Sequence, residues 1–163
     1  VNLSAVQFKN PNLAQQIKDV LRKYNIPPKY IVLEITESAV MEDVIAAQMT
    51  IDDLKAEGFA ISIDDFGTGY ASIGYLKKFT FDHLKIDISF IKEITDNVQD
   101  RSIVEAIISI AKTLNLKTIA EGIESKEQMD IMSALGCEMG QGFLWDTPIS
   151  APEIESKYLK ICQ

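Results

Sequence analysis

The chain has 163 residues, 47% of them hydrophobic and 25% charged, which is typical of one soluble globular domain with its own core. Its formal net charge is −8 at pH 7 and no segment concentrates lysine or arginine, which argues against polymeric DNA or RNA as a partner. No apolar segment approaches the roughly 18 residues that a membrane span requires, so we expect no insertion into a bilayer by this chain.

Short apolar segments alternate with longer segments of helical periodicity, a pattern that predicts a parallel sheet covered by helices. The predicted strands are Val1 to Ser4, Tyr30 to Thr36, Ala60 to Asp64, His83 to Ile86, Lys117 to Ala120 and Met139 to Gly142. The predicted helices are Asn12 to Tyr24, Val44 to Glu57, Ser72 to Lys77, Arg101 to Leu114, Lys126 to Leu135 and Pro152 to Leu159.

Several boundaries of these elements have a physical cause. Pro27 and Pro28 end the first helix, because proline lacks the amide donor and restricts the residue before it. Gly58 and Gly136 follow helical segments, where a left-handed cap is expected. The chain opens at Val1 without methionine and already reads as the end of a strand, so we expect it to begin inside a larger domain.

Polar residues recur at the carboxyl ends of the predicted strands. In a (β/α)8 barrel these ends form the active-site face, and eight βα units usually need about 250 residues. Six units in 163 residues therefore predict an α/β fold that is an incomplete TIM-like (β/α) barrel, with about six of eight units present. The polar residues are Asn2, Glu34, Asp64 with Asp65, Lys85 with Asp87, Glu121 and Gln141.

The alternation within the strands predicts which side chains face inward. In Leu84-Lys85-Ile86-Asp87 the aliphatic and charged residues fall on opposite sides of the strand. In a barrel the aliphatic side chains would pack on the helices and the charges would point inward. A buried charge is normally neutralised by an opposite charge or a metal ion.

Six motifs, in this order and spacing, resemble the signature motifs of bacterial EAL domains. The resemblance implies a partial EAL domain over residues 1 to 163, whose N-terminal strands and Glu-Ala-Leu motif would precede Val1. It also implies that the parent domain hydrolyses cyclic di-GMP to linear pGpG. The motifs are Val1-Asn2-Leu3-Ser4-Ala5, Leu33-Glu34-Ile35-Thr36-Glu37-Ser38, Asp64-Asp65-Phe66-Gly67-Thr68-Gly69-Tyr70, Leu84-Lys85-Ile86-Asp87, Ala120-Glu121-Gly122-Ile123-Glu124 and Gly140-Gln141-Gly142-Phe143.

The resemblance also implies roles for individual residues. The positions that match metal ligands are Asn2, Glu34, Asp64 and Glu121, with Asp65 shared by a second metal. The positions that match catalytic residues are Lys85, which contacts or deprotonates the attacking water, Glu121, and Asp87, a carboxylate near this lysine. The positions that match site-lining residues are Glu124 and Gln141, and Glu37 matches the glutamate that supports the loop from Asp65 to Tyr70.

Oxygen ligands of this kind suit Mg²⁺ or Mn²⁺, and histidine and cysteine are absent where a zinc site would need them. Two such ions would activate a water molecule and stabilise the charge that builds on the phosphoryl oxygens. Lys85 would add a positive charge. These properties agree with a phosphodiesterase that uses two metal ions.

Each feature also has a plainer interpretation. Aspartates before a glycine-rich loop, such as Asp64 and Asp65, often accept hydrogen bonds from nearby loop amides. Lys85 by itself is explained equally well as an interior lysine that pairs with Asp87 or another carboxylate. We assign His83 no function and read it as a structural or surface residue. At the level of the protein, the alternative is a non-catalytic cyclic di-GMP sensor. The isolated chain by itself is expected to be a stable fragment that is inactive or weakly active.

The resemblance further implies partners and a location. The expected ligand is cyclic di-GMP, the expected assembly is a homodimer, and a sensor or GGDEF domain is expected upstream in the parent protein. Cys137 and Cys162 lack the spacing of metal ligands and fit free thiols in a reducing compartment. We therefore expect a cytoplasmic domain, whether or not the parent protein is anchored in a membrane.

Overall fold

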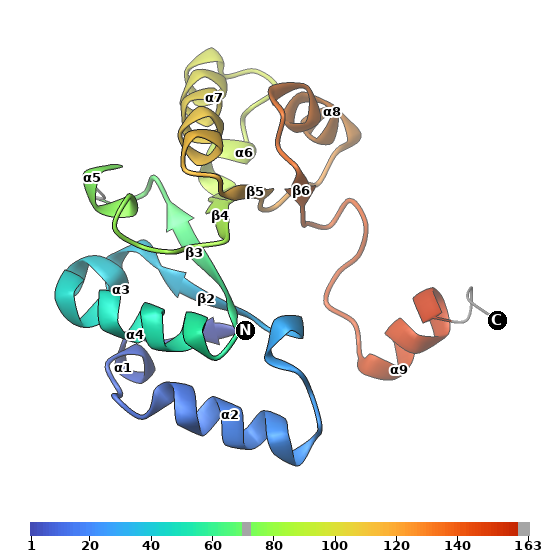
Figure 1. The fold of residues 1–163 in the computed structure, drawn as a ribbon. Coiled ribbons are helices and arrows are strands. Elements are labelled where there is room, and N and C mark those ends of the chain that lie inside the picture. The colour runs from blue at the N-terminus through green and yellow to red at the C-terminus, as the bar shows by residue number, and fades with distance from the viewer. Residues whose placement is uncertain (70–72, 160–163) are drawn as a thin grey trace.

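The fold is known from a computed structural model, which describes residues 1–69 and 73–159. Six strands form one sheet in the order β1-β2-β3-β4-β5-β6, and every neighbouring pair is parallel (Figure 1). This confirms the predicted α/β fold and all six predicted strands. The strands are β1 (Asn2–Leu3), β2 (Val32–Thr36), β3 (Ala60–Phe66), β4 (His83–Ile86), β5 (Lys117–Ala120) and β6 (Met139–Gly140).

The long helices confirm the predicted βα alternation. They are α2 (Leu13–Lys23), α4 (Val44–Ala56), α7 (Val98–Thr113) and α8 (Lys126–Leu135), and each ends within three residues of its predicted bounds. The predicted helix from Ser72 is seen from residue 73 as α5 (Ile73–Leu76), and Ser72 itself lies outside the described residues. The last helix divides into α9 (Ala151–Ile154) and a π-helical turn (Glu155–Leu159).

The sequence analysis missed four short helical segments. Three of them begin directly after a strand or one residue beyond it, so they belong to the carboxyl-end loops of the sheet. The segments are α1 (Ala5–Phe8), α3 (Glu37–Glu42), α6 (Ile88–Ile91) and a 3₁₀ turn (Pro28–Tyr30). Gly58 and Gly136 do adopt the left-handed conformation that was predicted, with φ of 90° and 87°.

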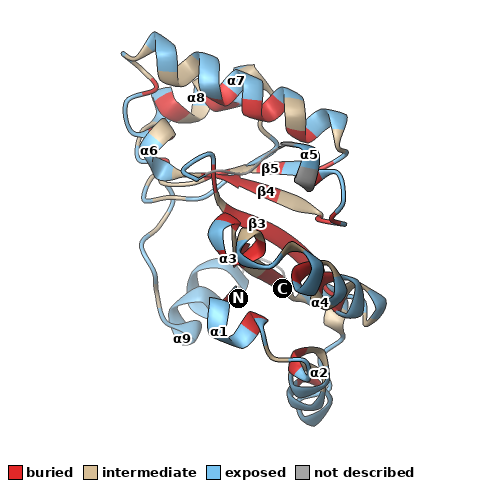
Figure 2. Ribbon diagram, turned by 90° about the vertical axis from the view of Figure 1, so that its left-hand side faces the viewer, coloured by how far each residue is buried: buried red, intermediate tan, exposed pale blue. Residues whose placement is uncertain are grey.

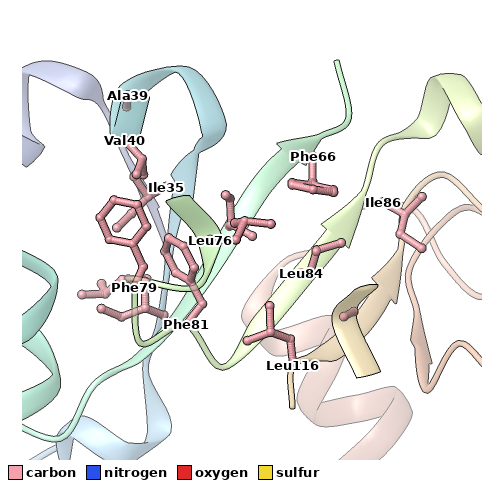
Figure 3. Close-up of a cluster of buried hydrophobic side chains, with 14 of the residues drawn as sticks. Ile35, Ala39, Val40, Phe66, Leu76, Phe79, Phe81, Leu84, Ile86 and Leu116 are labelled. Atoms are coloured by element: carbon pink, nitrogen blue, oxygen red, sulfur yellow. The ribbon is translucent and has the colours of Figure 1, made fainter. Parts of the chain in front are cut away.

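The hydrophobic core lies between the sheet and the helices. Leu84 and Ile86 of β4 are fully buried, and Figure 3 shows them in a cluster with Phe66 and Leu116. Figure 2 shows the buried residues along the strands and on the sheet-facing sides of the helices. The aliphatic side of the strands therefore packs on the helices, as the alternation predicted.

The sheet is curved but not closed. β1 and β6 form its two edges, and no pairing joins them in residues 1–69 and 73–159. The C-terminal helix α9 lies away from the strands (Figure 1). This open sheet of six βα units is the incomplete barrel that the sequence predicted. Among the described helices, none is long and apolar enough to cross a membrane.

Candidate functional site

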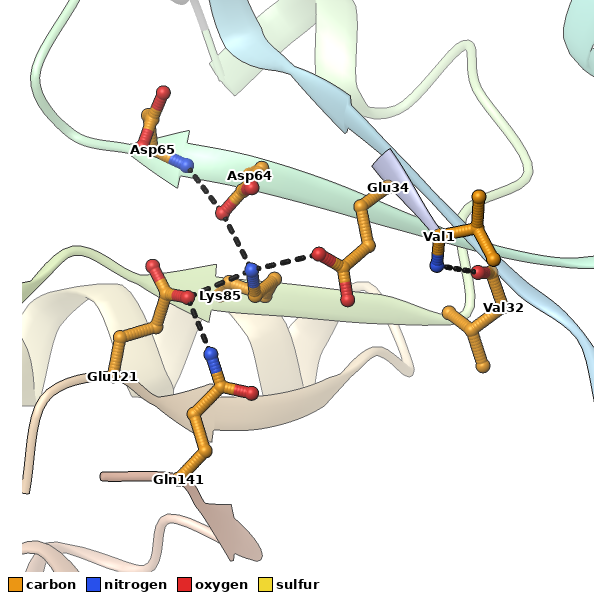
Figure 4. A network of polar contacts seen from close by, with 8 residues as sticks. All are labelled: Val1, Val32, Glu34, Asp64, Asp65, Lys85, Glu121 and Gln141. Carbon is orange, nitrogen blue, oxygen red and sulfur yellow. Dashed lines mark hydrogen bonds and ion pairs between the residues drawn. The ribbon is translucent and has the colours of Figure 1, made fainter. Parts of the chain in front are cut away.

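Lys85 lies at the centre of a cluster of carboxylates drawn from three other parts of the sheet. Its Nζ is 3.0 Å from Glu34 Oε2, 2.9 Å from Asp64 Oδ1 and 2.7 Å from Glu121 Oε1. Figure 4 shows the three carboxylates converging on this one ammonium group. Glu34 lies in the middle of β2, Asp64 in the second half of β3 and Glu121 directly after β5, so the parallel sheet brings together residues that are far apart in sequence.

The charges of this cluster do not balance. The side chain of Lys85 is only 4% exposed, and burial by itself would lower its pKa. Hydrogen bonds to Glu121, Asp64 and Glu34 outweigh burial and raise the pKa of Lys85 above its usual value, so it is firmly charged. One ammonium group then faces three carboxylates, with Asp65 beside them. A further cation would stabilise this excess of negative charge.

Two of the carboxylates have pKa values that are raised mainly by burial. Burial raises the pKa of Glu121, and repulsion from Asp64 and Glu34 adds to it, although Lys85 opposes the shift. Burial also raises the pKa of Asp65, followed by repulsion from Asp64 and Asp87. Carboxylates crowded in this way gain from a shared counter-charge.

A local irregularity of β3 allows Asp64 and Asp65 to reach the same site. Neighbouring residues of a regular strand point to opposite faces. Between Ile63 and Phe66 the register with β4 shifts, and Asp65 has a φ of 55°, a left-handed conformation that aspartate tolerates better than most residues. The bulge therefore turns two consecutive carboxylates toward one point.

The oxygen atoms are close enough to share a cation. Asp64, Asp65 and Glu121 each offer a carboxylate oxygen, and these atoms lie within 4.8 Å of one another. Glu34 reaches the same cluster through Lys85, and Asn2 is the register partner of Glu34 on the neighbouring strand. Carboxylate and amide oxygens are hard ligands, which fits a divalent cation such as Mg²⁺ or Mn²⁺.

Gln141 supports this cluster directly. Its Nε2 donates a hydrogen bond of 2.7 Å to Glu121 Oε1, the oxygen that Lys85 also contacts. Gln141, Glu121 and Glu124 together line a pocket of about 510 Å³. The structure thus places the two predicted site-lining residues next to a carboxylate of the cluster.

Asp87 has a different local role from its motif neighbour Lys85. Its Oδ1 accepts a hydrogen bond of 2.9 Å from Ser89 N and so caps the start of α6. It raises the pKa of Asp65 by repulsion, which places it at the edge of the cluster. No ion pair joins Asp87 to Lys85 within residues 1–69 and 73–159. The carboxylates that pair with Lys85 are instead those of Glu34, Asp64 and Glu121.

Glu37 contacts the loop after β3. It is 2% exposed, and its Oε2 accepts a hydrogen bond of 3.0 Å from Gly67 N. A Cβ atom placed on Gly69 would collide with the Glu37 carboxylate, so the loop passes very close to this side chain. These contacts fit the predicted supporting role. The far end of that loop, at Tyr70, lies outside the described residues.

Sequence reasoning missed part of the pocket wall. Ile88, Phe143 and Pro148 line the same pocket as Glu121 and Gln141. Ile88 directly follows the motif Leu84-Lys85-Ile86-Asp87, and Phe143 is the last residue of the motif Gly140-Gln141-Gly142-Phe143, which is the signal that would have found them. Apolar residues carry no chemical signature of a site in sequence, and only their position relative to Glu121 shows that they belong here.

Acidic side chains at the carboxyl ends of parallel strands, in a sheet built from βα units, define a barrel-type α/β domain with a site suited to a divalent cation. The model of the EAL domain family matches residues 1–148. The chain belongs to the EAL domain family.

Similar proteins support this assignment. The chain is 43% identical over 154 residues to the bifunctional diguanylate cyclase/cyclic di-GMP phosphodiesterase MucR of Pseudomonas aeruginosa, covering 94% of this chain and 22% of the relative. It is 35% identical to the cyclic di-GMP phosphodiesterase NbdA of the same organism, covering 95% of this chain and 20% of the relative. The chain therefore spans about a fifth of these relatives.

Solved structures share the fold. A structure of the PaMucR phosphodiesterase in complex with cyclic di-GMP matches with a TM-score of 0.91 and 43% identity, covering 94% of this chain and 62% of that chain. A manganese and cyclic di-GMP complex of Klebsiella pneumoniae BlrP1 matches with a TM-score of 0.82 and 26% identity, covering 88% of this chain and 37% of that chain.

Proposed function

We propose that the protein hydrolyses cyclic di-GMP to linear pGpG, and that this chain supplies the carboxylates and the lysine of a site that depends on Mg²⁺ or Mn²⁺. The observation that carries the proposal is the convergence of Glu34, Asp64 and Glu121 on Lys85 at the carboxyl ends of the strands. The cyclic di-GMP and manganese complexes of similar structures support this ligand and this type of cation.

The residues of the cluster fit a pair of divalent cations. Asn2, Glu34, Asp64 and Glu121 would hold the first ion, and Asp65 would be shared with the second. When bound, the ions supply Lewis acidity that activates a water molecule and neutralises charge on the phosphoryl oxygens. The requirement for cations follows from the charge of the cluster, since one ammonium group does not balance four neighbouring carboxylates.

The remaining residues would position the water and the substrate. Lys85 is held as an ammonium group and would donate a hydrogen bond to the attacking water or to a phosphoryl oxygen. Gln141 fixes the orientation of Glu121 through its hydrogen bond. Glu124 would line the space for the substrate in the adjoining pocket, and Asp87 would hold α6 beside Asp65.

Glu37 would keep the loop after β3 in its working position. Its buried carboxylate accepts the amide of Gly67, two residues after Asp65. An anchored loop reduces the freedom of Asp65, so it would strengthen binding of both cation and substrate.

The experiment that tests the proposal measures conversion of cyclic di-GMP to pGpG by the purified protein, with Mg²⁺ or Mn²⁺ and with EDTA. Asp64→Asn removes one charge and almost no volume, so it should abolish turnover and leave the fold intact. Asp52→Asn makes the same change on the exposed face of α4 and should leave turnover unchanged. Turnover that persists in EDTA, or an active Asp64→Asn variant, would reject the proposal.

A non-catalytic sensor is the alternative, and the same samples distinguish it. A sensor would bind cyclic di-GMP in a calorimetric titration and yield no pGpG with either cation. A stable fragment without function would do neither. Binding with turnover is the result that the charge distribution around Lys85 favours.

We also propose that the parent protein carries further domains upstream, such as a sensor or GGDEF domain, and acts in the cytoplasm as a homodimer. The bifunctional relative, of which the chain spans 22%, supports the additional domains. Light scattering of the purified protein would test the dimer, and the sequence of the parent gene would test the domains.

A further inference from the structure

A second pocket lies at the amino ends of the strands, opposite the carboxylate cluster. It measures about 600 Å³, and its wall includes Ala60, His83 and Lys117, the first residues of β3, β4 and β5. None of the carboxylates that surround Lys85 lines it. A pocket of this size accommodates a small organic molecule.

The two acidic side chains of this pocket are already engaged by the protein. Both oxygens of Asp82 lie 2.7 Å from Lys55 Nζ, and Asp82 Oδ2 also accepts the amide of Ile61 at 2.7 Å. Glu138 Oε2 accepts hydrogen bonds from Thr118 N at 2.8 Å and Thr118 Oγ1 at 2.6 Å. Both oxygens of Asp82 and one oxygen of Glu138 are therefore already occupied.

The two lysines of the pocket are not engaged in this way. Lys112 lies in the last turn of α7, and Lys117 opens β5. Lys112 is near enough to lower the pKa of Glu138, yet neither ammonium group forms an ion pair or hydrogen bond with another residue that the structure describes. The two ammonium groups therefore remain available as charged donors at this pocket, which suits an anion.

Two buried polar atoms beside the pocket also lack partners. Nδ1 of His83 and Oγ of Ser62 are inaccessible to solvent and form no hydrogen bond within the part of the chain that the structure describes. The two residues are register partners across β3 and β4. Buried polar atoms in folded proteins are nearly always paired. Of these two residues, His83 lines the pocket together with the two lysines, and Ser62 lies next to it on β3.

We infer that this pocket is a second ligand site, which binds the phosphate group of a small phosphorylated molecule through Lys112 and Lys117. A phosphate monoester carries about −1.5 to −2 charges at pH 7, which suits two ammonium groups at one site. Phe81 and Leu116 line the same pocket and provide apolar surface for the body of the molecule. This site is independent of the proposed hydrolysis, because it shares no residue with the carboxylate cluster.

The experiment titrates the whole chain with phenyl phosphate at constant pH and ionic strength, in EDTA, and follows the ring protons of histidine by NMR. The chain has one histidine, so the signal reports on His83 alone. We expect a saturable shift. Lys112→Gln and Lys117→Gln should each weaken the apparent affinity by about tenfold or more, as loss of a hydrogen bond to a charged group does.

Matched controls make the outcome decisive. Lys29→Gln removes the same charge from an exposed position elsewhere and should leave the titration unchanged, and so should Asp64→Asn in the carboxylate cluster. Circular dichroism of each variant would establish that the fold is kept. No saturable shift, an equal loss in Lys29→Gln, or unchanged affinity in both pocket variants would overturn the inference.

Discussion

Gln141 Nε2 donates a hydrogen bond of 2.7 Å to Glu121 Oε1, and the same oxygen lies 2.7 Å from Lys85 Nζ. Glu121 is therefore held from two sides, by an amide at one edge of the sheet and by an ammonium group from β4. A carboxylate that is oriented before a cation arrives binds the cation more strongly, because less freedom is lost on binding.

The first prediction concerns this hydrogen bond. Gln141→Ala should weaken the apparent affinity for Mg²⁺ or Mn²⁺ by about tenfold, the lower end of the effect of residues that orient metal ligands. Turnover measured over a range of cation concentrations would show the change. Gln99→Ala, on the exposed side of α7, is the control. If both variants require the same cation concentration as the unchanged protein, Gln141 does not position Glu121.

A second prediction concerns the contact between Gly69 and Glu37. Gly69→Ala introduces a Cβ that would collide with the Glu37 carboxylate, so either the loop or the glutamate must move. We expect turnover to fall by about tenfold or more, as shifts of about 1 Å in a positioning group can do. Stability measured by thermal unfolding should change much less than turnover, because Gly69 is exposed.

Glu37→Ala tests the same contact from the other side. It removes the group that accepts the Gly67 amide, and it also relieves the collision caused by Gly69→Ala. The double variant should therefore be no worse than Glu37→Ala alone. Fully additive losses would show that Gly69 and Glu37 act separately.

The fold, and the placing of polar residues at the carboxyl ends of the strands, were predictable from sequence for a physical reason. In Leu84-Lys85-Ile86-Asp87 the period of two places the aliphatic residues against the helices, and the burial of Leu84 and Ile86 confirms it. Motif residues far apart in sequence were expected at one face because parallel strands bring their carboxyl ends to the same edge. Glu34, Asp64 and Glu121 meet there at Lys85.

Other features depend on geometry that sequence patterns do not contain. The short helices α1, α3 and α6 have four to six residues each, too few for a helical period to be visible. The bulge at Asp64 and Asp65 requires a positive φ at a non-glycine residue, which tertiary contacts impose. The partners of Lys85 could not be chosen in advance, since Asp87 is much closer in sequence than Glu34, Asp64 and Glu121.

A third prediction uses the only histidine. Burial is the main cause of the lowered pKa of His83, and the charges of Lys117 and Lys55 add to it while Asp82 opposes. The folded state therefore disfavours the proton relative to the unfolded chain, whose histidine pKa is about 6.5. The stability that neutral His83 contributes is complete above that pH and is lost as the pH falls below it.

His83→Gln removes this titration. The free energy of unfolding of the unchanged protein minus that of the variant should be larger at pH 7.5 than at pH 5.5, as measured by denaturant unfolding. The carboxylates titrate in both proteins, so the difference isolates the histidine. A difference that grows as the pH falls would mean that the protonated ring is favoured in the fold, contrary to its burial.

The final prediction concerns the ammonium group itself. Lys85→Met keeps most of the side-chain volume but leaves three carboxylates without their common partner. Loss of one member of a buried ion pair typically costs about 3 to 5 kcal/mol, so we expect the free energy of unfolding at pH 7.5 without cations to fall by about 3 kcal/mol. Lys23→Met, an exposed position in the last turn of α2, should change it little.

The conditions that restore stability identify the cause. Lowering the pH protonates carboxylates and relieves their repulsion, so the deficit of Lys85→Met should shrink between pH 7.5 and 5.5. Added Mg²⁺ should stabilise the variant more than the unchanged protein, because the cation replaces the missing positive charge. Turnover should still be lost, since the variant lacks the ammonium group that would donate a hydrogen bond to water or phosphate. A deficit independent of both pH and Mg²⁺ would show that Lys85 stabilises the sheet by packing and not by its charge.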